Sequence, residues 1–482
     1  MSIGMVMAMA LASPDFSAAT FSDPLLGVRL RILTTDLEKR PGCALPQACR
    51  SPAALKGAYR FLAHPAVGVA NLLPAFLRPG IHALARQRAV IVPHDTTTFN
   101  FSHLESASGL GFINDSETAR GIHLHSSLLL DRDGNLVGIA ALQFWVRAQF
   151  RAETDAQVRQ LPIEAKESHK WLRGMRAVHE AFAAVTDTPP RVIHVMDREG
   201  DIHEVFQEVR QLGADAVIRC AQDRRVEGDA CNPIDYSKKR VAAQAALGTM
   251  TIRVPRQTGG YRQALVEVRA LDLRLRPHQG KHKSRRPVAL GLIEIREISA
   301  PPAGEAKASW WLWTTLRVRR VRQVKRVLQI YKARWRLEDY HRALKTGCQV
   351  EKLRLPDGDK LMKALAIQAY VATRVVRIRD CAKSDPEQDC AACFSADEWQ
   401  LLFARQQQRP WRPADGQPTL GAVVKWLARL GGHQGRANDP CPGAECLAKA
   451  LYALDLLLQG RDLGIAQAAV EQHELKETKP QT

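Results

Sequence analysis

The chain has 482 residues, and its 69 lysines and arginines exceed its 50 aspartates and glutamates, which gives a net charge of +19. Such an excess favours a polyanionic partner. The apolar first residues lack the basic segment of a signal peptide, because the first basic residue is Arg29, and no later run is long and apolar enough to span a bilayer. Ten cysteines at this length do not suggest a disulfide scaffold. We therefore expect a cytoplasmic protein.

Three regions follow one another along the chain. We expect a helical N-terminal region at 1–68, a middle region at 69–385 and a helical C-terminal region at 386–482. A polar stretch that contains Pro386 marks the second boundary.

The middle region alternates between strand-like and helix-like patterns. The turn Asp133-Gly134 joins two alternating runs and is typical of a hairpin. In chain order we predict strands at 89–92, 121–130 and 136–147, a helix at 166–185, a strand at 191–196, a helix at 201–212 and a strand at 214–218. Followed by a late acidic helix, this is the element order of the ribonuclease-H-like fold, an α/β fold with a mixed sheet.

Two of the predicted strands end next to an acidic residue. The run at 89–92 is followed by Asp95, and the run at 191–196 by Asp197. Sheets of this class place their chemistry at such strand ends. Asp201 is a weaker candidate, which we expect to open the following helix.

A helix is predicted over 321–346, with two distinct faces. An apolar stripe recurs at three- and four-residue steps, formed by Val327, Ile330, Ala333, Leu337, Tyr340 and Leu344. Tyr331, Arg334, Glu338 and Lys345 share a second face. Cations and an aromatic ring around one glutamate suit a polyanion, with the carboxylate left to hold a metal. Because paired metals in phosphodiester-cutting sites need several carboxylates, Asp95 and Asp197 are the expected partners of Glu338.

Several motifs in compatible order resemble one family. They are Asp95-Thr-Thr97, Asp197-Arg-Glu199, the Tyr331-x2-Arg334-x3-Glu338-x6-Lys345 spacing, Gly57-Ala-Tyr59-Arg60-Phe61, Lys166-Glu-Ser-x-Lys170-Trp171-Leu172 and Ala428-Arg-Leu-Gly431-Gly432. Together they are similar to the DDE transposases of the insertion-sequence-4 group, and the resemblance covers nearly the whole chain.

The resemblance implies both a fold and a reaction. It implies a ribonuclease-H-like catalytic domain with a β-rich insertion at about 221–308, and a metal-holding catalytic triad of Asp95, Asp197 and Glu338. Two Mg²⁺ ions, for which Mn²⁺ can substitute, would serve nicking, hairpin formation and strand transfer in cut-and-paste transposition. Such a protein acts in the bacterial cytoplasm, at the nucleoid.

The resemblance also implies DNA contacts and a partner subunit. Tyr331, Arg334 and Lys345 would grip the end phosphates, Trp310 would stack on a flipped base, and Arg219 would contact DNA. Tyr59 and Arg60 would belong to an N-terminal domain that binds the transposon's terminal repeats. The C-terminal region would pair two subunits as a homodimer on double-stranded terminal-repeat and target DNA.

Two other functions are compatible with the sequence. One is a catalytically inactive DNA-binding inhibitor of transposition, which the intact acids argue against. The other is a ribonuclease-H-like endonuclease without strand transfer, which would have little use for the Tyr331, Arg334 and Lys345 grip.

Some residues keep a structural alternative. Tyr59 can simply pack its small domain, and Trp311 or Trp313 can take the role of Trp310. A leucine seam in the C-terminal region is either a dimer contact or part of the subunit's own core; it consists of Leu447, Leu451, Leu454 and Leu458. Cys390 and Cys393, with Cys381 nearby, are either a zinc site or ordinary reduced thiols.

Overall fold

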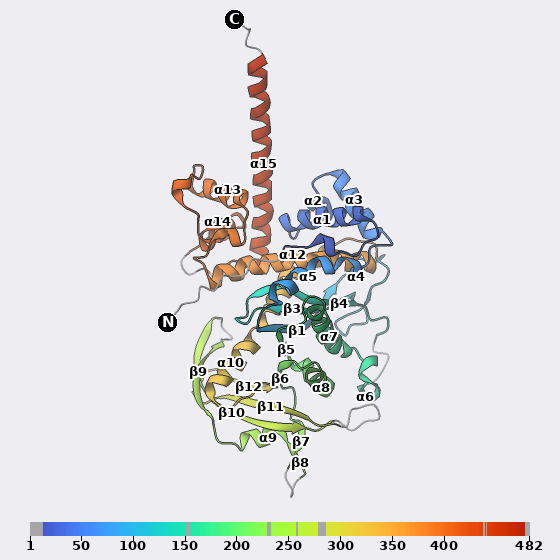
Figure 1. Cartoon of the computed structure of the whole chain (residues 1–482), viewed down its shortest axis with the longest axis vertical. Coiled ribbons are helices and arrows are strands. Elements are labelled where there is room, and N and C mark those ends of the chain that lie inside the picture. Colours follow the sequence, from blue (N-terminus) through green and yellow to red (C-terminus); the bar gives the residue numbers. More distant parts are fainter. Residues whose placement is uncertain are drawn as a thin grey trace.

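The computed structural model describes residues 13–150, 155–228, 233–256, 259–277, 286–436, 439 and 441–477. A long helix, α12 (Gly358–Ser384), crosses the molecule, with one large sheet on one side and most helices of both chain ends on the other (Figure 1). No helix in these ranges is long and apolar enough to cross a bilayer.

The centre of the sheet has ribonuclease-H-like topology, as expected. Its strands run in the order β4-β3-β1-β5-β6, where β1, β5 and β6 are parallel and the β1-β3 and β3-β4 pairs are antiparallel. Their bounds are β1 (Ala89–Asn100), β3 (Arg120–Leu130), β4 (Leu136–Trp145), β5 (Arg191–Met196) and β6 (Asp215–Arg219). The predicted hairpin joins β3 to β4, where Gly134 has a φ of +89° that favours glycine. A short strand, β2 (Gly111–Phe112), pairs with the start of β3.

Helices cover both faces of this sheet. Ile91, Ile193 and Val217 share a buried cluster with apolar residues of α10, α11 and α12, and we call this side of the sheet the acid face. Val90 and Val92 point the other way, toward helices that include α5 and α7. The bounds are α5 (Pro74–Leu84), α6 (Asp155–Gln160), α7 (His169–Ala183), α8 (His203–Gln211), α10 (Val321–Lys332) and α11 (Trp335–Arg342).

The β-rich insertion continues the sheet beyond β6. Strand β12 pairs with β6, and the sheet extends through β11 and β10, with β9 and β7 both pairing with β10. The bounds are β7 (Arg225–Glu227), β8 (Ile234–Tyr236), α9 (Ser237–Ala242), β9 (Gly248–Pro255), β10 (Tyr261–Leu275), β11 (Val288–Glu297) and β12 (Ser309–Thr314). The β-rich insertion expected at about 221–308 thus forms strands, the longest of which are β9, β10 and β11.

The N-terminal region is helical, as predicted. Side chains of Asp23 and Ser51 cap α1 and α3 by accepting backbone N–H bonds at their first turns. Helices α1, α3 and α4 pack against α12. The bounds are α1 (Pro24–Lys39), α2 (Leu45–Ala48), α3 (Pro52–Ala63) and α4 (Val69–Leu72).

The C-terminal region ends in a long helix that leaves the body of the molecule (Figure 1). Its helices are α13 (Ala396–Gln407), α14 (Leu420–Leu430) and α15 (Ala444–Glu477). Leu447, Leu451 and Leu454 are buried in the subunit's own core, and Leu458 packs against it. The dimer-contact interpretation of this seam is therefore wrong, because α14 and α12 already cover it.

The helix predicted over 321–346 is divided. Helix α10 ends at Lys332, a tight turn follows at Ala333 and Arg334, α11 ends at Arg342, and a π-helical turn occupies Ala343–Gly347. In the tight turn the Leu337 N–H donates to the Arg334 carbonyl, an i to i+3 bond.

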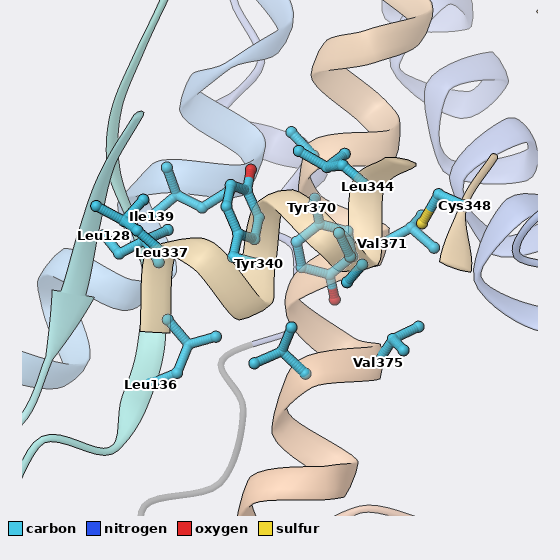
Figure 2. Close-up of a cluster of buried hydrophobic side chains, with 14 of the residues drawn as sticks. Leu128, Leu136, Ile139, Leu337, Tyr340, Leu344, Cys348, Tyr370, Val371 and Val375 are labelled. Atoms are coloured by element: carbon cyan, nitrogen blue, oxygen red, sulfur yellow. The ribbon is translucent and has the colours of Figure 1, made fainter. Parts of the chain in front are cut away.

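The apolar stripe nevertheless stays buried through these changes of helix type. Figure 2 shows Leu337, Tyr340 and Leu344 packed against side chains of β3, β4 and α12. Because this apolar face is buried, the polar face of α11 is held in one orientation relative to the sheet.

Candidate active site

Strand register brings the first two acids together. β1 and β5 pair in parallel from Ala89 opposite Arg191 to Pro93 opposite Val195. Two residues farther in the same register, Asp95 lies opposite Asp197, and both point to the acid face by alternation from Ile91 and Ile193. Neighbouring strands are about 4.8 Å apart, so the two carboxyl groups are neighbours.

Asp95 does not end its strand as predicted. β1 continues to Asn100 because residues 94–100 pair with β3 in antiparallel fashion, so Asp95 stands where the parallel pairing with β5 stops. Burial, followed by the charge of Asp197, raises the pKa of Asp95 to about 6. Because the two carboxylates are neighbours in a half-buried position, a nearby cation stabilises their ionised forms.

Arg334 supplies that cation and joins Glu338 to the pair. Its Nη1 donates to Asp95 Oδ2 at 3.1 Å, and its Nη2 donates to Glu338 Oε1 at 2.5 Å. The Arg334 side chain is 12% exposed, against 20% for Asp95 and 33% for Glu338. The three predicted acids thus surround one edge of the sheet, with a guanidinium between two of them.

The donor chemistry at this edge fits a hard divalent cation. Asp95, Asp197 and Glu338 would hold it, since Mg²⁺ prefers carboxylate oxygens. Among the described residues, however, no three His, Cys, Asp or Glu side chains are already arranged as a metal site. In this arrangement Arg334 bonds two of the three carboxylates.

Tyr331 and Arg219 adjoin the acids. Burial raises the pKa of the Tyr331 phenol, while the charges of Arg334 and Arg219 oppose that change, so both guanidinium groups lie close to the ring. Arg219 ends β6 on the acid face, where its Nη2 donates to the Ser309 carbonyl at 2.9 Å. Its buried Nη1 has no hydrogen-bond partner.

Trp310 shares the acid face with these residues. Leu312 pairs with Arg219, and Trp310 lies two residues earlier on the same side of β12, half-buried against the same cluster. Trp311 and Trp313 point to the other face, where Trp313 is fully buried and packs edge-on against Phe206. Trp311 and Trp313 therefore face away from the acids, and the geometry of the strand favours Trp310 over them.

Lys345 also lies on this side of the sheet. It belongs to the π-helical turn after α11, and its Nζ is 6.0 Å from the centre of the Phe99 ring. Phe99 shares the parity of Asp95 in β1. Tyr331, Arg334 and Glu338 therefore lie together, although not on one continuous helix, whereas Lys345 lies beside Phe99, about 13 Å along β1 from Asp95.

Tyr59 and Arg60 lie elsewhere. They belong to α3, on the opposite side of α12 from the sheet (Figure 1). Tyr59 is 40% exposed, whereas Phe61 is buried. Phe61 packs the small domain, so Tyr59 is not needed for that purpose and its ring faces outward.

Asp201 has a different role from the one expected. Its Oδ1 accepts from Arg224 Nε at 2.7 Å and its Oδ2 accepts from the Ala221 N–H at 2.7 Å. Helix α8 begins at His203, after an Ile202 that offers no side-chain cap. Asp201 thus anchors the start of the insertion and does not open the helix.

The sequence does not predict Lys170 and Glu199 as site residues, yet the structure places them near Asp95. The Nζ of buried Lys170 lies 3.6 Å from Glu199 Oε2, and the charge of Glu199 contributes to the raised pKa of Asp95. Both residues occur within motifs of the sequence. Their spacing along the chain, however, gives no signal that α7 and the turn after β5 meet.

Two family models match parts of this chain. Residues 8–67 match the transposase DNA-binding domain, and residues 170–373 match the transposase DDE domain. A solved piggyBac transposase synaptic complex with hairpin DNA is similar at 9% identity and a TM-score of 0.32, over 76% of this chain and 67% of that one. The DDE match includes Asp197 and Glu338, whereas Asp95 precedes it. The chain is therefore a DDE transposase with a DNA-binding domain near its N-terminal end.

Proposed function

We propose that this transposase moves an insertion sequence of the insertion-sequence-4 group by cut-and-paste transposition, with Asp95, Asp197 and Glu338 as its catalytic acids. The observation that carries the proposal is that Arg334 bonds both Asp95 and Glu338 while the pairing of β1 with β5 brings Asp197 beside Asp95, at the edge of a ribonuclease-H-like sheet. Two Mg²⁺ ions held by the acids would activate the attacking oxygen and stabilise the leaving oxygen of DNA phosphodiesters.

Other side chains of the site would hold the DNA end. Arg334 and Lys345 would contact end phosphates, and the guanidinium fork suits bidentate phosphate binding. Trp310, half-buried on the acid face, would stack on a base turned out of the duplex when a hairpin forms at the transposon end. Arg219 has a buried Nη1 without a partner and would donate to the same DNA strand.

Recognition of the terminal repeats would fall to the N-terminal helices. Residues 8–67 match a transposase DNA-binding domain, and Tyr59 and Arg60 are exposed on α3. Binding to such an acidic polymer would weaken steeply as salt increases, given the net charge of +19. This activity would take place in the cytoplasm, at the bacterial nucleoid.

A homodimer would form through the projecting part of α15. Leu456, Leu463 and Val470 recur every seven residues there and are 46%, 73% and 58% exposed. Heptad spacing of apolar residues is typical of a coiled-coil seam. This set replaces the buried leucine seam as the candidate dimer contact.

The test uses DNA that spans the predicted ends of the element around its own gene. The DNA is incubated with the protein and Mg²⁺ or Mn²⁺ and resolved on denaturing gels. We expect nicks that mature into hairpins with wild type and with the control Glu180→Ala, which changes an exposed glutamate of α7, but not with Glu338→Ala.

The other outcomes separate the alternatives. Binding without cleavage by wild type would support a DNA-binding inhibitor of transposition. Metal-dependent nicks that never become hairpins would support an endonuclease without strand transfer.

A further inference from the structure

A buried lysine lies where α7 meets the turn after β5. Lys170, in the first turn of α7, is 7% exposed, and its Nζ lies 3.6 Å from Glu199 Oε2 and 3.7 Å from Glu167 Oε1. The rings of Trp145 and Trp171 also lie near, with their centres 5.7 and 5.8 Å from Nζ. Because a buried ammonium group is costly unless it is paired, these four groups hold the Lys170 side chain in one place.

The two carboxylates beside Lys170 differ in how firmly they are held. Glu167 accepts two hydrogen bonds from Arg147, at 2.7 and 3.0 Å, and such a bidentate pair defines the position of both groups. The Glu199 side chain is 65% exposed. Lys170 therefore links a fixed carboxylate to one that lies mostly in solvent.

Glu199 in turn orients Asp197, through the backbone of the turn that spans residues 197–201, which we call the Asp197 turn. Asp197 Oδ1 accepts the Glu199 N–H at 2.9 Å, so the position of the Glu199 backbone sets the rotation of that carboxyl group. Asp201 anchors the far end of the turn to the start of the insertion. The ion pair between Lys170 and Glu199 attaches the middle of the turn to α7.

We propose that Lys170 is a positioning residue for the reaction, because its ion pair with Glu199 holds the Asp197 turn and thereby keeps the Asp197 carboxylate beside Asp95. This role rests on the proposed function, in which Asp197 is a catalytic acid. Among the described residues, the ion pairs of Lys170 are to Glu167 and Glu199 and not to a catalytic acid, so its effect passes through Glu199. Misplacing a reacting group by about 1 Å can slow a reaction about 100-fold.

Two variants remove the ion pair from opposite sides. Lys170→Met removes the charge and keeps the apolar stem, while Glu167 keeps its bonds to Arg147 and the exposed Glu199 can be hydrated. Glu199→Gln removes the other charge at an exposed position. Arg173→Met is the matched control, because Arg173 is an exposed cation on α7, three residues after Lys170.

The first experiment measures amide hydrogen exchange of the full-length, metal-free protein without DNA. Peptides that cover 197–201, where the Glu199 N–H reports directly, should exchange roughly fivefold faster in Lys170→Met and in Glu199→Gln, while peptides of β1 and α12 and all peptides of Arg173→Met should match wild type. Unchanged exchange in the turn would overturn the proposal. If Lys170→Met exchanges faster throughout the chain, its fold is lost, and Glu199→Gln alone decides the outcome.

The second experiment measures the single-turnover rate of end cleavage and the Kd for end DNA. Each single variant should cleave at least about tenfold more slowly with an unchanged Kd, and the double variant should be no slower than the slower single variant, because both changes act through one ion pair.

Three results of this second experiment contradict a positioning role. They are unchanged cleavage by both single variants, additive losses in the double variant, and a Kd for DNA that rises in parallel with the loss of rate. Asp197→Asn separates this inference from the proposed function. If that variant cleaves end DNA as well as wild type does, the proposed function fails, while hydrogen exchange still determines whether Lys170 holds the Asp197 turn.

Discussion

Replacing Arg334 with alanine should tighten the binding of Mn²⁺ to the protein without DNA. The guanidinium contacts Asp95 at 3.1 Å and Glu338 at 2.5 Å, so it neutralises two of the three carboxylates that would hold the metal. A metal entering the wild-type site must displace it. In the variant the same oxygens are available and repel one another.

The size of the effect follows from the two contacts. Hydrogen-bonded ion pairs are worth about 1.5–3 kcal/mol each, but Asp95 and Glu338 are 20% and 33% exposed, which weakens them. At about 1 kcal/mol per contact, displacement costs about 2 kcal/mol, so the Kd for Mn²⁺ should fall roughly 30-fold in Arg334→Ala.

Calorimetric titration of metal-free protein with Mn²⁺ measures this directly. Arg342→Ala is the matched control, because that side chain is 64% exposed and lies 4.0 Å from its acidic neighbour, so its Kd should equal that of wild type. Unchanged or weaker binding by Arg334→Ala would refute the reasoning. It would mean that Arg334 holds the carboxylates in position and does not compete with the metal.

Three further predictions test neighbouring parts of the molecule. Because the pKa of Asp95 is raised to about 6, its ionised form destabilises the metal-free fold above pH 6, and this penalty disappears below about pH 4. Asp95→Asn should therefore raise the free energy of unfolding by up to about 3 kcal/mol at pH 8 but not at pH 4, as measured by thermal or urea unfolding. If the variant and wild type are equally stable at pH 8, the prediction is wrong. Trp310→Ala should reduce hairpin formation on end DNA at least tenfold in a gel assay, whereas Trp311→Ala should not. Equal losses in the two variants would show that the face of β12 on which the tryptophan lies does not decide hairpin formation. Leu463→Asp, at a position 73% exposed on α15, should convert dimers to monomers in light scattering without changing the circular dichroism spectrum, and an unchanged mass would exclude this helix as the dimer contact.

Much of the catalytic fold could be predicted from local pattern. Each strand of the ribonuclease-H-like centre carries a continuous or alternating apolar run, and the turn at Gly134 separates the runs of β3 and β4. The strand at 191–196 has the predicted bounds, because Pro189 and Pro190 precede it and Asp197 follows it. The end of β1 could not be predicted, since Thr96, Thr97 and Thr98 are polar yet β-branched, and pairing with β3 decides their conformation.

The division of the acidic helix had no sequence signal either. Residues 333 and 334 are alanine and arginine, both good helix formers, so propensity predicts an unbroken helix. The tight turn and the later π-helical turn are consequences of tertiary packing, because they keep Leu337, Tyr340 and Leu344 buried against β3, β4 and α12 (Figure 2). The expected continuous helix between the residues of the quartet was therefore wrong, while their roles stay predictions.

Histidines on the sheet face opposite Asp95 explain why its charge is balanced on the acid face. His94 and His194, on the opposite face of β1 and β5, are fully buried and hydrogen-bonded to each other at 2.8 Å, and His94 also bonds Ser127 at 2.8 Å. Burial holds the pKa of both rings well below 6.5, so they are neutral at physiological pH. A neutral polar layer stabilises the strands without offering positive charge to the acids. Arg334 therefore supplies the counter-charge that Asp95 has in this structure, and the predicted metal would be the alternative source.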